Sequence, residues 1–575
     1  MSIDNVDLIC GDAAHTLLND PQFLQSWQLL HTACPHATAF QGPGFVRAWY
    51  ASYAAQWQPV LVRSTDAAGA LVGLWLLAYE SAARQLVNAG SHHAEYHTWL
   101  SVAGAGEQLL ASGWSLLKRQ FNFSSLRFKY LPDPALGDML LPAFADSGGV
   151  ALRRSARPLL RLDAEEIRAS AAKKSNKSRF NRLTRLGKLE FRRISDPAEF
   201  ERIFDELIDF YDLRQSAVNQ STPFREDPAK RTFHSTLFAE APGDIYCTAT
   251  FIDERPVAAF WGAISGPMVH LGLLISSPFC AEHSPGKIHI MQLSEQMLQD
   301  GHAVLDLTPG GDAWKERFAN GHDEVAEATV YRAALTRRRD EAVAQIAQQG
   351  KRALAVAHIT PAQVRAAIAT VRRATPAAVA RKLGNLRGQR REFRVYRADR
   401  TLAGKFDFDP RVRSNHIADL LAFEPSESWQ SRDAFLSSAL ARIEQGGSAF
   451  TVGVEGRLAH SGWMGVNQAT SHMTEVGQTM SFPPHSVALY DFYSHPDFRG
   501  GGLYRATIGH MLRTAFIAED TEFAYISVLA DNGPSRHVIE SMGFSYQESY
   551  FWERRLGTER KWSSADMAIA GAANA

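Results

Sequence analysis

A run of three glycines between a strand pattern and a helix pattern restricts the fold of this chain more than any other feature. Residues 486–493 have the apolar and aromatic composition of a strand, and residues 505–517 follow the periodicity of a helix. The glycines, Gly500 to Gly502, lie between them. Because glycine has no Cβ, the backbone can turn tightly there and leave the unpaired N–H groups of the helix start open to a ligand. The helix dipole adds positive charge at the same point, so the pattern predicts a phosphate cradle.

Length and composition indicate a globular chain of several domains. The 575 residues correspond to about three to four domains, and 45% of them are apolar, as in globular proteins. The 61 Lys and Arg residues balance the 61 Asp and Glu residues, which argues against a globally basic nucleic-acid binder. No apolar stretch reaches the ~18 residues that a bilayer crossing needs.

The N-terminus and the cysteines favour a cytoplasmic protein. Asp4 and Asp7 stand where a signal peptide would carry Lys or Arg. The four cysteines are far apart and form no CxxC pair, which argues against a zinc ribbon and against a disulfide framework. We therefore expect a cytoplasmic chain with free thiols and no transmembrane segment.

Helix and strand patterns alternate along most of the chain, which predicts an α/β fold with mixed sheets. The second of three segments opens with a basic helix at about 173–188. It also contains two strand patterns that predict a hairpin, 245–252 and 257–264. The three segments are 1–165, 166–335 and 393–558.

Between the second and third segments, residues 336–392 are rich in alanine and strongly basic. From Arg337 to Glu392, thirteen Lys and Arg residues stand against three acidic residues. We interpret this stretch as a helical connector that acts as a solvated spacer or, alternatively, contacts an anionic surface or a nucleic acid through residues 337–391. Small residues dominate the end of the chain, and we expect a disordered tail over 559–575.

A second motif follows the glycine run by about thirty residues. A strand pattern at 523–529 leads into Asn532, Ser535 and the pair Gly543-Phe544. Together the two motifs resemble those of the GNAT superfamily of N-acetyltransferases, RxxGxG and NxxSxxxxxxxGF. The resemblance is close over about 60 residues, and segment 393–558 has the length of that fold.

The resemblance implies that acetyl-CoA, or another acyl-CoA, is the co-substrate. Its pyrophosphate would lie on the loop amides, its pantetheine arm along the preceding strand, and the second motif would contact it from the other side. Tyr504 departs from the family loop, which usually has Gly or Ala there. The residues implied to bind are Phe492, Tyr493, Arg499, Gly500, Gly501, Gly502, Leu503, Tyr504, Asn532 and Ser535.

The catalytic groups are less defined. Asp491 lies two residues from Tyr493, and strand alternation predicts that both face the same side. A carboxylate there could take a proton from an ammonium acceptor, or could only orient the strand. His495 is the second candidate base. The family's usual thiolate-protonating tyrosine is replaced by Ile539, so Tyr546 is the candidate acid, with Tyr550 as an alternative.

The first two segments carry a more diffuse resemblance over about residues 35–335. Residues 40–50, 284–287 and 306–315 look like the CelD-like acetyltransferases, distant relatives of the FemAB-like aminoacyltransferases. The resemblance implies a FemAB-like pair of acetyltransferase-type domains. Gly286 and Lys287, at a predicted helix start, could receive a phosphate or a carboxylate, although plain turn chemistry also accounts for them.

One histidine cluster invites a metal hypothesis that we do not favour. Residues 93, 95 and 97 would share one face of a strand, and the cluster consists of His92, His93, Glu95 and His97. It has no fourth ligand at a recognisable spacing, so we expect an acceptor-pocket or structural role and no metal.

These patterns predict three acetyltransferase-type domains and an acyl-CoA-dependent acyltransferase. The expected reaction is transfer of an acyl group to an amine or hydroxyl of a small molecule, sugar or peptide, without a metal. One alternative is a degenerate binding module in an exopolysaccharide assembly. Another is tRNA-dependent aminoacyl transfer, with the basic helix near 173–188 contacting RNA.

Overall fold

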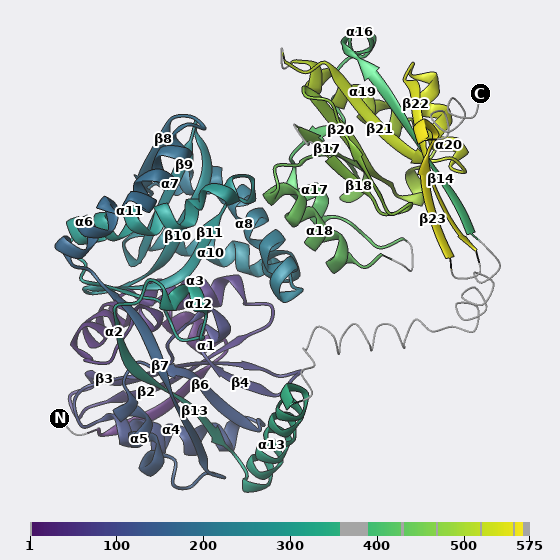
Figure 1. The fold of residues 1–575 in the computed structure, drawn as a ribbon. Coiled ribbons are helices and arrows are strands. Elements are labelled where there is room, and N and C mark those ends of the chain that lie inside the picture. Colours follow the sequence, from purple (N-terminus) through teal and green to yellow (C-terminus); the bar gives the residue numbers. More distant parts are fainter. Residues whose placement is uncertain are drawn as a thin grey trace, which may run out of the picture. The chain divides into compact units, whose positions relative to one another are not determined.

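The computed structural model describes residues 3–356, 389–426, 430–466, 470–517, 520–555 and 558–566. The chain divides into two compact units, shown in Figure 1. The first comprises Met1–Tyr211 with Pro223–Arg352, and the second comprises Asp212–Thr222 with Ala353–Ala575. Within the described residues, no helix is both long enough and apolar enough to cross a membrane.

The first unit begins with a five-stranded antiparallel sheet. Its order is β1-β2-β3-β4, and β5 also pairs with β3. Helix α4 packs its apolar side, including Leu109 and Trp114, against this sheet. The strands are β1 (Asn5–Cys10), β2 (Gln58–Thr65), β3 (Leu71–Glu80), β4 (Gln85–Asn88) and β5 (Leu100–Ser101), and the helices are α1 (Asp12–Leu17), α2 (Pro21–Ala33), α3 (Pro43–Ser52), α4 (Gly106–Gln120) and α5 (Pro134–Ala143).

An eight-stranded sheet forms the rest of this unit, in the order β6-β13-β7-β12-β11-β10-β9-β8. The pair β11–β12 is parallel. The strands are β6 (Ser125–Leu131), β7 (Val150–Arg161), β8 (Leu189–Arg193), β9 (Ile245–Ile252), β10 (Arg255–Ser265), β11 (Met268–Ser276), β12 (Val304–Asp306) and β13 (Gly321–Tyr331). The helices are α6 (Ala164–Ala172), α7 (Lys174–Thr184), α8 (Pro197–Asn219), α9 (Pro223–Glu226), α10 (Pro228–Glu240), α11 (Pro285–Gln299) and α12 (Ala313–Glu316). The last residues of α8, from Asp212, are counted with the second unit.

This sheet agrees with the sequence patterns in part. The predicted hairpin is present, because β9 and β10 pair antiparallel through a short turn after Ile252. Strands β6 and β7 lie in segment 1–165 but pair with β13 of segment 166–335, so the two segments share one sheet. The basic helix expected at about 173–188 is α7, which ends earlier, at Thr184; a separate helix, α6, precedes it, because Lys173 has a non-helical backbone.

The second unit contains another eight-stranded sheet, in the order β15-β16-β17-β20-β21-β14-β22-β23. Strands β20 and β21 are parallel neighbours. The strands are β14 (Gln389–Asp399), β15 (Arg413–Ser414), β16 (Ser448–Val454), β17 (Arg457–Val466), β20 (Ser486–Ser494), β21 (Phe523–Leu529), β22 (Ser545–Arg555) and β23 (Thr558–Ser563), with a separate pair of β18 (Thr470–Met473) and β19 (Gln478–Ser481). The helices are α16 (Arg400–Ala403), α17 (Ile417–Leu421), α18 (Arg432–Glu444), α19 (Leu503–Ile517) and α20 (Gly533–Ser541).

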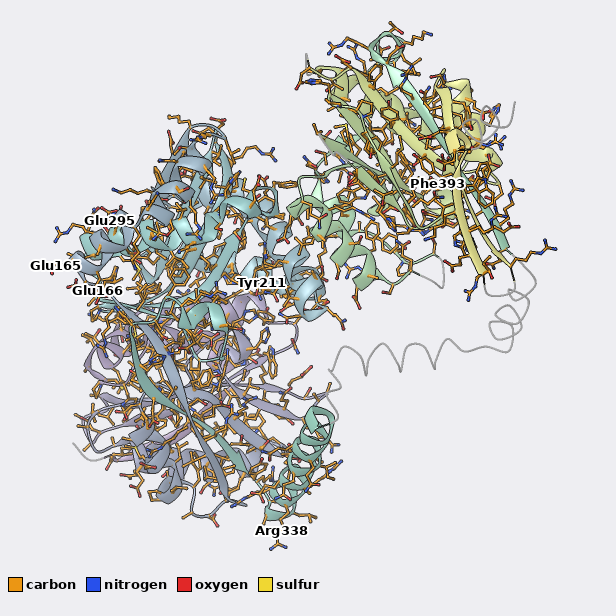
Figure 2. The ribbon with its side chains drawn as sticks, viewed as in Figure 1. Glu165, Glu166, Tyr211, Glu295, Arg338 and Phe393 are labelled. Atoms are coloured by element: carbon orange, nitrogen blue, oxygen red, sulfur yellow. The ribbon has the colours of Figure 1, made fainter. Side chains whose placement is uncertain are left out.

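Apolar residues cover both faces of this sheet. On one face, Ile508 and Leu512 of α19 pack on Leu489 and Ile526 of the two parallel strands. On the other face, Phe393, labelled in Figure 2, belongs to a second cluster with Met473, Val476 and Met480. Burial of this side-chain area fixes α19 against the middle of the sheet.

One expectation about the chain ends is changed, and a second is tested only at its start. The tail predicted to be disordered over 559–575 begins with β23, because Trp562 stacks on Phe551 at a ring-centroid distance of 5.3 Å and the strand pairs with β22. Residues 567–575 lie outside the described residues. The predicted helical connector begins with α13 (Ala334–Val356), and its residues 357–388 also lie outside them.

A β-bulge interrupts strand β20 near its end. Trp463 of β17 pairs with Tyr490, but Ser461 pairs with Tyr493, so Gly462 faces two residues of β20. One of these, Asp491, has a φ of 49°. The other, Phe492, lies so close to Gly462 that a Cβ there would be 2.5 Å from the phenyl ring.

We expect Gly462→Ala to lower the free energy of unfolding of the second unit by about 1–3 kcal/mol, because the added methyl group overpacks against Phe492. Hydrogen exchange of β17 and β20 amides at increasing urea concentration measures this unit separately. Gly404→Ala is the control, because its Cβ would have no neighbour closer than 3.9 Å. Equal stability of both variants would contradict the close packing.

Candidate functional site

The glycine run lies directly before helix α19 and is exposed. Gly500 has a φ of 81° and Gly502 a φ of 73°, in the left-handed region that favours glycine. A Cβ on either residue would meet no atom within 4 Å. The glycines are therefore required by the backbone conformation, and the space in front of the loop is open.

The backbone N–H groups at this helix start make no hydrogen bond to any residue that the structure describes. The first helical hydrogen bond runs from the N–H of Ala506 to the oxygen of Gly502, at 3.0 Å. For the N–H groups from Gly500 to Arg505, the described residues provide no hydrogen-bond acceptor. Six successive donors at the positive end of a 15-residue helix form a site for an anion such as a phosphate.

Two arginines flank these donors. The guanidinium of Arg499 donates to the carbonyl of Ser494 at 3.4 Å. The guanidinium of Arg505 donates to the hydroxyl of Ser541 at 3.3 Å. Both residues are exposed, so they add full positive charges at the edge of the loop.

The parallel strands beside the loop separate where they approach it. Their pairing runs from Ser486 opposite Phe523 to Leu489 opposite Ile526. Strand β20 nevertheless continues to Ser494, and β21 continues to Leu529. Beyond Leu489, no strand among the described residues pairs with the edge of β20 that faces β21, so its backbone groups can bind an extended ligand.

Tyr504 joins the two sequence motifs. Its hydroxyl lies 2.8 Å from the hydroxyl of Ser535, and the N–H of Ser535 donates to the side chain of Asn532 at 3.2 Å. Burial raises the pKa of Tyr504 to about 12, so the phenol keeps its proton at neutral pH. The bulky residue is accommodated because it points away from the loop, against Phe492 at a centroid distance of 4.9 Å.

Asp491 and Tyr493 both reach the side of the sheet where α18 lies, as alternation predicts. The carboxylate of Asp491 forms an ion pair with the guanidinium of Arg442 on α18, with an N–O distance of 2.5 Å, and the Asp491 side chain is about half exposed. The ring of Tyr493 lies 6.3 Å from that of Phe435 on the same helix. Phe492, between them, faces the opposite side, against Tyr504.

The other two candidate catalytic residues have local partners. His495 is buried, and its Nδ1 accepts from the N–H of Asp497 at 3.2 Å, while its Nε2 lies 2.9 Å from the Arg457 guanidinium. Tyr546 donates to Ser549 at 3.0 Å and lies on β22. That strand is three places from β20 in the sheet, about 14 Å away, so the structure does not bring Tyr546 to the glycine loop.

Sequence patterns missed His460 of β17. Its side chain is fully buried and its Nδ1 lies 2.8 Å from the hydroxyl of Ser494. Its Nε2 is buried without a hydrogen-bond partner among the described residues. Burial lowers its pKa to about 3, so the ring is neutral. It lies beside Phe492 and Tyr504, and a lone histidine in a strand pattern gives no signal of this position.

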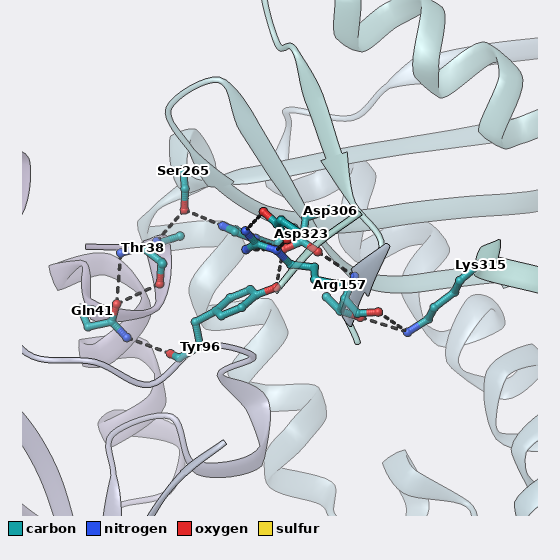
Figure 3. A network of polar contacts seen from close by, with 11 residues as sticks. Thr38, Gln41, Tyr96, Arg157, Ser265, Asp306, Lys315 and Asp323 are labelled. Atoms are coloured by element: carbon teal, nitrogen blue, oxygen red, sulfur yellow. Dashed lines mark hydrogen bonds and ion pairs between the residues drawn. The ribbon is translucent and has the colours of Figure 1, made fainter. Parts of the chain in front are cut away.

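A buried polar network lies in the first unit, as Figure 3 shows. The carboxylate of Asp306 accepts from Tyr96 at 2.5 Å, from His270 at 2.8 Å and from the N–H of Thr308 at 2.8 Å. Burial alone would raise the pKa of Asp306, but the hydrogen bonds of His270 and Tyr96 and the charges of His270 and Arg157 together outweigh it and the pKa is lowered. Lys315 donates to the hydroxyl and carbonyl of Thr308. Its ammonium group is therefore already hydrogen-bonded to the turn that follows β12.

The histidine cluster does not have the predicted arrangement. Residues Ser91–His93 form a 3-10 helix, so the expectation that 93, 95 and 97 share a strand face is wrong. Glu95 pairs with Lys129 at 2.9 Å, and Nε2 of His97 lies 2.8 Å from the carbonyl of Ser91. His92 and His93 instead approach Asp227, and the possible ligand atoms of these three lie within 4.8 Å of one another.

Comparison with known proteins identifies a recognised family in segment 166–335. Residues 170–316 match the family model described as an acetyltransferase (GNAT) domain. None of the curated proteins matches the chain.

Solved structures give weak similarities. FemX has 9% identity and a TM-score of 0.39, over 54% of this chain and 96% of its own. L-PGS from Bacillus licheniformis has 9% identity and a TM-score of 0.34, over 54% and 91%. A tandem GNAT protein of the clavulanic acid biosynthesis pathway has 15% identity and a TM-score of 0.21, over 64% and 99%. These values carry no argument about function. The family model assigns an acetyltransferase (GNAT) domain to residues 170–316, as the resemblance of the second segment implied.

Proposed function

We propose that this chain is an acyl-CoA-dependent acyltransferase whose second unit binds the acyl-CoA, with the first two segments forming a FemAB-like pair. The observation that carries the proposal is the row of N–H groups from Gly500 to Arg505 that find no acceptor within the described structure, placed where β20 and β21 separate. A diphosphate fits the free amides and the positive helix end. A linear arm fits the free edge of β20, and the GNAT match at 170–316 supports acyl transfer in the same chain.

The residues that would hold the co-substrate are those at this helix start and strand edge. Gly500, Gly501, Gly502, Leu503 and Tyr504 offer backbone N–H groups, and Arg499 offers charge. Phe492 and Tyr493 lie on the separated part of β20. Acyl-CoA would supply an activated thioester, so no protein nucleophile and no metal is needed for direct transfer.

The proton of the acceptor can be assigned to one side chain. Asp491 is about half exposed and held by Arg442, so it can accept a proton from an amine or hydroxyl acceptor. Tyr504 keeps its proton at neutral pH, but its hydroxyl is bonded to Ser535 and its ring lies on the other side of the sheet from Asp491, so the departing thiolate would take its proton from water. The acceptor would be a small molecule, a sugar or a peptide.

A binding module without turnover is the second candidate. Ile539, at the position of the family's usual acid, is fully buried in the core and carries no proton donor. Saturable acyl-CoA binding with no acyl transfer to any acceptor would favour this candidate.

Calorimetric titration of the full chain with acetyl-CoA tests the cofactor assignment. We expect saturable binding that Gly502→Val weakens at least ~10-fold, because a branched residue at positive φ displaces the loop. Gly501→Ala is the matched control, because its Cβ would lie at ordinary contact distance from one backbone atom. The assignment fails if acetyl-CoA does not bind or if both variants bind as the parent does.

Asp491→Asn is expected to lower kcat at least ~100-fold, because the amide cannot accept the acceptor's proton. The KM for acetyl-CoA should stay unchanged. Release of free thiol from acetyl-CoA, in the presence of pooled amines, amino sugars and peptides, measures turnover. Asp433→Asn on α18 is the control and should retain the parent rate. Parental kcat in Asp491→Asn would remove this residue from the mechanism.

A further inference from the structure

A pocket in the first unit brings together two basic sequence features that are far apart in the chain. Its volume is about 830 Å³, within the range of about 300–1,000 Å³ for small-molecule sites. Helices α6 and α7 form one wall, and α11 and the chain after α12 form the other. Figure 2 labels two acidic residues on its border, Glu166 and Glu295.

Positive charge dominates the lining. The two acidic residues stand against five cations, which are Arg161, Lys173, Lys177, Lys287 and Arg317. Glu166 is bound to the amide of Asn320 at 2.9 Å. The ion pairs formed among the described residues include none of the five cations. Elsewhere in this unit many cations are paired, as Arg231 is with Glu201 and Asp205.

The cations are close enough to affect one another. Burial lowers the pKa of Lys287, and the like charges of Arg179, Lys173 and Arg317 lower it further. An anion between these side chains would relieve the repulsion, because opposite charge favours the protonated lysine. Lys287 also lies in the first turn of α11, where the helix dipole favours negative charge.

The fold holds this arrangement in place. Lys173 stands at the break between α6 and α7, and the buried side chain of Asn176 donates to the carbonyl of Ser170 at 2.9 Å. That hydrogen bond ties the two helices together beside the pocket. The position of Lys173 is thus set by the backbone and is not that of a freely mobile surface lysine.

The remaining lining is apolar, with one unused polar atom. Ile167, Phe180 and Phe318 line the pocket, and Phe180 is 40% exposed. The Oε1 atom of Gln292, another lining residue, is buried without a hydrogen-bond partner in the described structure. An apolar surface beside cations and an unused acceptor suits a ligand that joins a phosphate group to a ring carrying N–H donors.

We propose that this pocket binds a phosphorylated small molecule of the nucleoside diphosphate class, separately from the glycine loop of the second unit. Its phosphates would lie among Lys173, Lys287 and Arg317, and its ring would lie against Phe180 and Phe318. Inorganic diphosphate shares only the charged part of this chemistry, so it should bind more weakly than ADP.

Calorimetric titration with ADP and with inorganic diphosphate tests the proposal. The full chain carries Gly502→Val as background, which removes the loop of the second unit from the measurement. We expect saturable ADP binding, tighter than that of diphosphate, and at least ~10-fold weaker in the double variant Lys173→Gln, Lys287→Gln. Lys174→Gln is the control, because it removes one positive charge beside Lys173 at a residue that does not line the pocket, and it should bind as the background does.

Each other outcome overturns the proposal. These are the absence of ADP binding, equal weakening by Lys174→Gln, and diphosphate binding as tight as that of ADP. A short RNA that binds in a pocket-dependent and steeply salt-dependent way, where ADP does not, would assign the cations to nucleic acid instead. Circular dichroism of the double variant establishes that it is folded. Failure of acetyl-CoA to bind the parent chain would leave this test unaffected.

Discussion

The end of pairing between β20 and β21 is the constraint on which the candidate site depends. The strands stop pairing after Leu489 and Ile526, and the bulge at Asp491 turns the last residues of β20 relative to the first. Free backbone groups are costly when they are buried, but here they are exposed and water can satisfy them. The glycine loop extends the same arrangement into the start of α19. A ligand that replaces this water therefore finds donors already oriented, which reduces the ordering that binding must impose.

The packing beneath the loop explains how the chain tolerates this open backbone. Tyr504 points inward and links the first turn of α19 to Ser535 on α20. The ring of Phe492 packs directly on Gly462, where a side chain would leave it no room. The core cluster around Ile508, Met511 and Leu512 holds the helix on the sheet. The rigid part of the site is therefore formed by side chains on one face, and the functional part by backbone on the other.

Much of this could be predicted from sequence because it depends on local patterns. The glycine run, the strand at 523–529 and the hairpin of β9 and β10 follow from composition and spacing within one stretch of chain. The bulge could not be predicted in this way, because it depends on Gly462, a residue of a different strand. The positions of His460 and Tyr546 depend on strand order, which no local pattern contains. The strand β23 was missed because its stability comes from pairing with β22 and from the contact of Trp562 with Phe551. The joining of Lys173 and Lys287 in one pocket is likewise a long-range effect, although each residue was already singled out as basic or as part of a helix start.

The most direct test of the central claim is hydrogen exchange of the full chain with and without saturating acetyl-CoA. Bound diphosphate would accept hydrogen bonds from the N–H groups at residues 500–505, which have no acceptor among the described residues. These amides should then exchange more slowly, and the slowing should be absent in Gly502→Val. Unchanged exchange at 500–505 under saturation, or slowing confined to the first unit, would contradict the account.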